Sequence, residues 1–221
     1  SCSPIPSDNT YRKETDLYII KLPLNPGHAQ TCELHYSGWM ASVILSLEYA
    51  YLSGYEYYIY VEQDAALYGK NLIGEVVKVL DKKSYIFGSG SGTPQIIQQS
   101  FFAVHRRGIR RFLEGLHRIE SSDRDISPEM KFHIALCSGI AYKILILFSD
   151  QRLIKKITNK STQRLLWALQ RRILKILFNI TKNYEVWSFG FGRSRPINFD
   201  DDTYYFQHGE DAEIARHMIN L

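Results

Sequence analysis

Residues 57–67 read YYIYVEQDAAL, and this stretch decides the fold that we expect for the rest of the chain. Its first half is a run of aromatic and β-branched residues, which favours a buried β-strand. The run ends at Glu62 and Asp64, two carboxylates separated by one residue. Because a buried unpaired carboxylate is costly, acids that end a core strand are expected at its exposed carboxyl edge, where ligands bind in open α/β sheets.

This acidic pair has two interpretations. Two hard oxygen donors at a sheet edge suit Mg²⁺ or Mn²⁺ and, through the metal, a diphosphate. The alternative is a strand that simply runs into a solvated turn. The stretch alone leaves both interpretations open.

Strand and helix patterns alternate on both sides of this stretch. An apolar run over 16–24 and a helical pattern over 37–53 precede it, which predicts a strand–helix–strand unit, normally a right-handed parallel crossover. We therefore predict one α/β domain over 1–221, a mostly parallel central sheet flanked by helices. The other predicted helices cover 70–80, 106–119, 127–136 and 161–181, with an apolar element continuing to 148, and the other predicted strands cover 84–88, 95–104 and 203–207.

The composition fits a single globular domain but the charge is unevenly spread. The chain has 221 residues, of which 45% are hydrophobic and 23% charged, and its formal net charge is +4. The segment 150–182 holds nine basic side chains against one acid. We interpret this segment as a basic helical insertion or appendage of the domain.

The predicted helix over 161–181 is amphipathic and also has two interpretations. It could lie on an anionic membrane surface, or it could pack its apolar stripe on the sheet and leave a solvated basic face. No nucleic-acid recognition motif accompanies the charge, so no nucleic-acid partner is expected. The apolar stripe consists of Leu165, Leu169, Ile173, Ile176 and Ile180, and the basic residues roughly opposite are Arg164, Arg171, Lys175 and Lys182.

The cysteines indicate the redox state of the compartment and do not indicate a metal or disulfide site. There are three, widely spaced, which gives neither a disulfide framework nor a zinc spacing and favours a reducing environment. No apolar stretch reaches the roughly 18–20 residues of a spanning helix. The prediction is a cytoplasmic protein, peripheral on a membrane if the basic helix binds one.

Several stretches together resemble GT-A-type glycosyltransferases, which are nucleotide-sugar-dependent enzymes with a single Rossmann-like domain. The resemblance covers roughly residues 16–135 and 187–210, and two departures are visible. The acidic motif is Glu-x-Asp instead of Asp-x-Asp, and fewer residues precede it than is usual in the family. The stretches are NPGH at 25–28, YIYVEQD at 58–64, QQSFFAV at 98–104 with an Arg-rich helix after it, and RSRP at 193–196 followed by His208.

The resemblance implies a set of metal ligands. Asp64 would coordinate Mn²⁺ or Mg²⁺ that bridges the diphosphate of the donor, with Glu62 as a second and less secure ligand. His208, just past a late strand, resembles the final metal ligand of many members. Taken alone, His208 favours a surface histidine after a strand, and the aromatic strand before it and Gly209 after it reduce that preference.

It also implies contacts to the donor. Arg193 and Arg195 would offset the charge that develops on the leaving group. Asn25 and His28 occupy the turn that precedes the first predicted helix, on the donor side.

A carboxylate base would deprotonate the acceptor hydroxyl, and Glu129 and Asp125 compete for that role. Glu129 also complements a helix dipole just after Ser127-Pro128, and Asp125 lies in a polar loop that favours solvation. Both alternatives remain open at the level of sequence.

The function expected from the resemblance is transfer of a sugar from a nucleotide-sugar donor to a glycan or lipid-linked acceptor, with inversion, as in polysaccharide biosynthesis. A sugar nucleotidylyltransferase is an alternative, although no Gly-rich, Arg- or Lys-bearing loop follows the first predicted strand. The non-enzymatic alternative is a basic module that binds membranes or polyanions and whose acids form only a turn.

Overall fold

The computed structural model describes residues 27–29, 31–32, 34–62, 65–69, 71–90, 96–187 and 203–207. For 65–69, 203–207 and Leu153 only the backbone is described. The predicted strand over 16–24 lies outside these residues. The strand–helix–strand unit that would begin with it therefore stays a prediction.

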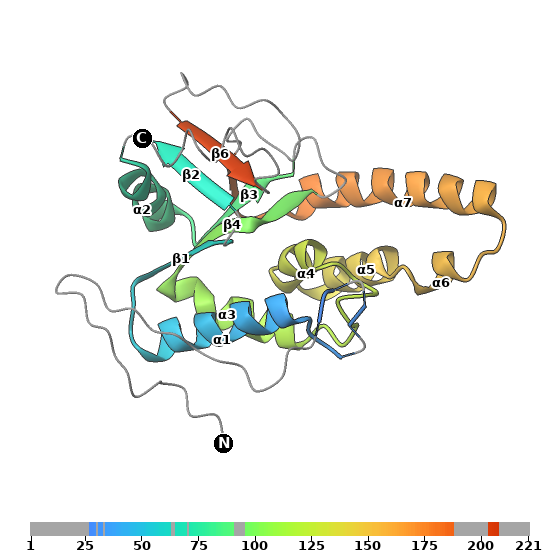
Figure 1. The fold of residues 1–221 in the computed structure, drawn as a ribbon, viewed down its shortest axis with the longest axis horizontal. Helices are drawn as coiled ribbons and strands as arrows, with labels where there is room; N and C mark the ends of the chain where they lie inside the picture. The colour runs from blue at the N-terminus through green and yellow to red at the C-terminus, as the bar shows by residue number, and fades with distance from the viewer. Residues whose placement is uncertain are drawn as a thin grey trace.

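The central sheet has four strands in the order β1-β4-β3-β5 (Figure 1). β4 is antiparallel to both of its neighbours, and β3 is parallel to β5, so β1, β3 and β5 all run in one direction. These strands are β1 (Tyr57–Val61), β3 (Tyr85–Ser89), β4 (Ile97–His105) and β5 (Glu185–Trp187).

The sheet is therefore mixed, and the prediction of a mostly parallel sheet needs correction. The physical reason is the connection between β3 and β4, which has only seven residues. A parallel crossover needs about a dozen or more residues, whereas a short connection returns the chain antiparallel to the strand it has left.

Helices cover both faces of this sheet. α1 (Gly38–Leu52), α3 (Arg106–His117) and α4 (Pro128–Ala135) pack on one face, and α2 (Leu72–Lys82) packs on the other. The strands alternate accordingly, since Phe87 and Phe102 join the larger core cluster and Ile86 and Phe101 the smaller one. The α/β class is thus confirmed in this open, three-layer arrangement.

Local sequence explains where α1 begins and ends. The Ser37 hydroxyl accepts a hydrogen bond from the Met40 backbone N–H at 3.3 Å, as an N-cap does. The helix ends at Ser53 and Gly54, and Gly54 has φ +80°, which a residue with a side chain rarely adopts. The reversal delivers the chain directly into β1.

A helical hairpin projects from the domain. α7 runs away from the sheet beside α5 and α6, as Figure 1 shows. Leu174 and Phe178 are the buried apolar residues of α7. The stripe over 165–180 that could have packed on the sheet instead faces largely outward, which excludes that interpretation of the helix. The helices are α5 (Gly139–Ser149), α6 (Arg152–Lys155) and α7 (Lys160–Thr181).

A separate two-stranded ribbon joins distant parts of the chain. β2 (Ala65–Gly69) pairs antiparallel with β6 (Thr203–Gln207), and Ala65 lies opposite Gln207. The strand over 203–207 was predicted, whereas β2 and the short β5 were not.

Two further sequence expectations can be compared with the described residues. Within them, no helix combines the length and apolar character that a membrane span requires. Cys32 and Cys137, the two cysteines within the described residues, are both buried free thiols.

Candidate functional site

The carboxyl ends of β1, β3 and β5 define one edge of the central sheet, because these three strands run in the same direction. Glu62 follows β1 at this edge, and its backbone N–H donates to the Ser100 carbonyl at 2.9 Å. This bond extends the β1–β4 pairing by one step beyond Val61. The acid-tipped strand thus ends at a sheet edge, as the sequence predicted.

Buried polar side chains gather on β4 beside this edge. Gln98 and Ser100 lie in the first half of β4, and both are buried among apolar neighbours. Gly88 of β3 lies opposite Gln98, and a Cβ at Gly88 would approach the Gln98 Cβ to 3.3 Å. β4 therefore carries buried polar side chains beside the residue that ends β1.

The β2–β6 ribbon is adjacent in the chain to two predicted metal ligands, Asp64 and His208. Both lie outside the described residues, but each is joined by one peptide bond to a described one. Asp64 precedes Ala65 and His208 follows Gln207, and these two neighbours are paired across the ribbon. Segments almost 140 residues apart in the chain therefore converge next to both predicted ligands.

An aromatic junction connects β1 to the helices on its larger core face. The Trp39 ring lies 5.7 Å from the ring of Tyr60 and 5.7 Å from that of Phe132, between centroids. Tyr60 is the penultimate residue of β1, Trp39 lies in the first turn of α1, and Phe132 lies in α4. The start of α1 and the body of α4 are thereby tied to the acidic end of β1.

His28 lies near the start of α1. Its carbonyl accepts hydrogen bonds from the backbone N–H groups of Thr31 and Cys32, at 3.0 and 2.8 Å. The preceding Gly27 carbonyl accepts from the Gly38 N–H at 3.0 Å, which holds the turn against α1. The His28 side chain is exposed, and its predicted role toward the donor stays a prediction.

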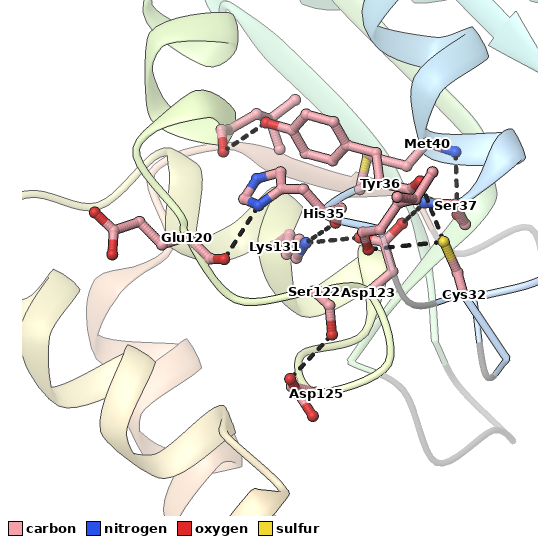
Figure 2. Close-up of polar contacts among 12 residues, drawn as sticks. Cys32, His35, Tyr36, Ser37, Met40, Glu120, Ser122, Asp123, Asp125 and Lys131 are labelled. Atoms are coloured by element: carbon pink, nitrogen blue, oxygen red, sulfur yellow. Dashed lines mark hydrogen bonds and ion pairs between the residues drawn. The ribbon is translucent and has the colours of Figure 1, made fainter. Parts of the chain in front are cut away.

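A buried ion pair fixes α4 to the segment before α1 (Figure 2). Lys131 Nζ lies 2.7 Å from Asp123 Oδ1 and donates to the His35 carbonyl at 3.2 Å. Asp123 Oδ2 accepts the Ser37 backbone N–H at 2.7 Å. Burial lowers the pKa of Lys131, and the Asp123 carboxylate opposes that shift. One polar cluster therefore holds together the loop after α3, helix α4 and the entry to α1.

The two candidate bases occupy different settings. Glu129 is half-buried in the first turn of α4, the helix that the ion pair anchors. Asp125 Oδ2 accepts a hydrogen bond from the Ser122 hydroxyl at 2.9 Å, and in Figure 2 this pair points away from the buried cluster. That bond gives Asp125 a role in shaping its own loop, while its assignment as a base stays a prediction.

The remaining predicted site residues, Asn25, Arg193 and Arg195, lie outside the described residues. Within the part of the chain that the structure describes, no group of three or more His, Cys, Asp or Glu side chains is arranged to hold a metal ion. Two of the three predicted ligands are outside that part.

Sequence reasoning missed the Asp123–Lys131 cluster. Lys131 stands between Met130 and Phe132 in a short helix that is buried on most sides, so no periodicity marks it as interior. A lysine between two large apolar residues was the only available signal.

No protein-family model matches this sequence, and no curated protein and no solved structure matches the chain.

Proposed function

We propose that this chain is a divalent-metal-dependent glycosyltransferase that transfers a sugar from a nucleotide-sugar donor to a glycan or lipid-linked acceptor. The pairing of Ala65 with Gln207 is the observation that carries the proposal. Ala65 and Gln207 are the immediate chain neighbours of Asp64 and His208, whose carboxylate and imidazole suit Mn²⁺. Ala65 also follows closely in the chain after Glu62, which ends β1 at the sheet edge.

The donor set fits the implied metal. Asp64 and His208 would hold Mn²⁺ or Mg²⁺, with Glu62 as a further oxygen ligand from the end of β1. When bound, such an ion supplies positive charge that neutralises the diphosphate leaving group. Arg193 and Arg195 would add to that charge.

The chain's own residues complete the chemistry on the acceptor side. The Glu129 carboxylate accepts the proton of the attacking acceptor hydroxyl, which favours inversion at the sugar carbon. One observation favours Glu129 over Asp125. Glu129 lies in the first turn of α4, a helix that is anchored through the buried Lys131–Asp123 pair. Anchoring limits the movement of a base that must stay within hydrogen-bond reach of its substrate.

Thermal unfolding tests the metal and donor site. A panel of nucleoside diphosphates is added with Mn²⁺, and one of them should raise Tm by about 5–10 °C when it is about 100-fold above its Kd. Asp64→Asn and His208→Asn should abolish this rise. Glu75→Gln, an exposed carboxylate on α2, is the matched control and should retain it. The proposal fails if no nucleoside diphosphate stabilises the protein with Mn²⁺ or Mg²⁺.

Reaction products distinguish the enzyme classes. A glycosyltransferase supplied with its donor should slowly release a nucleoside diphosphate and free sugar by hydrolysis, and the panel of nucleotide sugars identifies the donor. A sugar nucleotidylyltransferase would instead release inorganic diphosphate from a nucleoside triphosphate and a sugar 1-phosphate.

A further inference from the structure

Helix α7 carries a stripe of large apolar side chains that the domain leaves uncovered. Leu165, Leu169, Ile176 and Ile180 are 71%, 51%, 60% and 74% exposed. At 100° per residue, their positions fall within an arc of about 60°. Single exposed apolar residues are ordinary on protein surfaces, but a continuous stripe along a helix marks a contact surface.

Basic side chains accompany this stripe. Arg172 is exposed and borders the stripe, about 20° outside its arc, and Arg164, Arg171 and Lys175 are exposed farther round the helix, between the stripe and the buried side. From 151 to 184 the sequence contains no Asp or Glu. The contact surface therefore combines apolar area with uncompensated positive charge.

The neighbouring helix has the same character. In α5, Ile140 and Leu147 are 77% and 67% exposed, and Lys143 is exposed on the turn between them. α5 packs along α7, so the two helices form one projecting hairpin (Figure 1). We use the name basic hairpin for α5, α6 and α7 together.

We propose that the basic hairpin lies on the surface of an anionic phospholipid bilayer. The apolar stripe of α7 enters the boundary between headgroups and acyl chains. Arg172 at the edge of the stripe contacts lipid phosphates directly, and the more distant Arg164 and Lys175 add to the attraction of the anionic surface. The inference rests on exposure and charge alone, so it holds or fails independently of the proposed glycosyl transfer.

The positive charge of α7 favours an anionic lipid surface over a second copy of the chain as the partner. Two α7 stripes packed together would bring Arg172 and its basic neighbours close to their own equivalents, with no acid on the helix to compensate them. A nucleic acid would satisfy the cations but would leave the apolar stripe in water. An anionic lipid surface satisfies both parts of the contact.

Vesicle co-sedimentation tests the proposal with the full chain. Phosphatidylcholine vesicles with and without phosphatidylglycerol are the probes, and binding should require the anionic lipid. Leu165→Ser/Leu169→Ser and, separately, Arg172→Glu/Lys175→Glu should each weaken the partition coefficient at least about tenfold. The matched controls are Leu52→Ser/Ile73→Ser and Lys82→Glu/Lys83→Glu, which change exposed residues on or next to α1 and α2 and should bind as the wild type does.

Three outcomes would overturn the proposal. The protein could ignore anionic vesicles at low salt. The serine pair could bind as well as the wild type while the glutamate pair does not, which would indicate a purely electrostatic contact with polyanions. The chain could instead form a dimer that the serine pair dissociates, with no vesicle binding. All the exchanged side chains are exposed, so unchanged Tm values are expected and confirm that each variant is folded.

Discussion

Lys131 Nζ lies 2.7 Å from Asp123 Oδ1, and neither side chain is exposed to solvent. The carboxylate also accepts the Ser37 N–H, and the ammonium donates to the His35 carbonyl. Each charge is therefore compensated from two directions in a place that excludes water. Such a pair contributes little net stability relative to an apolar substitute, but the loss of one partner leaves the other charge buried and uncompensated.

The first prediction concerns this pair. Lys131→Met should lower the free energy of unfolding by about 3–5 kcal/mol, because Asp123 loses its counter-charge inside the core. Asp123→Leu/Lys131→Met should recover part of that loss, since it removes both charges. Urea unfolding of the two single variants and the double variant measures the coupling between them.

The exposed pair of Lys78 with Glu75 is the control. Its atoms lie 3.6 Å apart, and both side chains are more than half exposed. Lys78→Met should change the free energy of unfolding by less than about 1 kcal/mol. Equal effects at the two lysines would contradict the role assigned to the buried pair.

The second prediction concerns pH and His133. Burial lowers the pKa of His133 from 6.5 to about 4. Its Nδ1 lies 2.8 Å from the Tyr184 hydroxyl and its Nε2 lies 2.9 Å from Thr181 Oγ1. The unfolded chain takes up a proton near pH 6.5, whereas the folded chain does so only near pH 4, so the free energy of unfolding falls as the pH drops between these values. The loss from this residue is about 3 kcal/mol.

The variant His133→Gln distinguishes the contribution of His133 to the pH dependence of stability from the contribution of the carboxylates. The glutamine can replace a hydrogen bond but does not titrate, so the variant should be less stable at neutral pH and less sensitive to acid. Denaturant titrations of both proteins at several pH values from 7 to about 4 measure the difference. Parallel pH profiles would exclude His133 as the source.

The third prediction concerns the close approach of α3 to α4. A Cβ added at Gly115 would overlap the backbone carbonyl of Ala135. Gly115→Ala should therefore destabilise the protein by about 1–3 kcal/mol, although glycine to alanine in an exposed helix normally stabilises by about 0.5–1 kcal/mol. Glu114→Ala, at the neighbouring exposed position, should have only a small effect. Thermal unfolding measures the effect. Gly115→Ala should lower Tm, and a raised Tm would contradict this prediction.

The fourth prediction links the ribbon to ligand binding. Tyr205 lies opposite Leu67 in the β2–β6 pair, and proline there restricts the backbone and removes its N–H donor. Tyr205→Pro should abolish the rise in Tm produced by Mn²⁺ with a nucleoside diphosphate, whereas Tyr205→Val should retain it. The far-UV circular dichroism of both variants should match the wild type, because the main sheet does not include the ribbon. If Tyr205→Pro still shows the rise in Tm, ligand binding does not depend on the ribbon.

The sequence predicts most of the secondary structure because apolar periodicity and end signals agree there. α1 has an N-cap at Ser37 and a glycine just past its end, and β4 contains the apolar run over 101–104. β2 and β5 are short, and their identity as strands depends on partners far away in the chain, so local patterns do not reveal them.

The orientation of α7 shows the limit of periodicity. Helical spacing identifies two apolar groups, one containing Leu165 and Ile176 and the other Leu174 and Phe178. Only tertiary contact decides which is covered, and here Phe178 packs against His133 and Tyr184. In the candidate site, Glu62 lies at the predicted sheet edge. The Asp123–Lys131 pair was not predicted, because it forms by tertiary contact and no local sequence pattern indicates it.

The β2–β6 ribbon also determines the order in which the molecule can be completed. Residues 65–69 are synthesised well before residues 203–207, the segment with which they pair. Closing so long a loop carries an entropic cost that slows folding, and the main sheet can form before it. A growing chain therefore acquires its core first, and the ribbon that adjoins the proposed cation site closes last. The proposed cation site would therefore be completed only after residues 203–207 have been synthesised and paired.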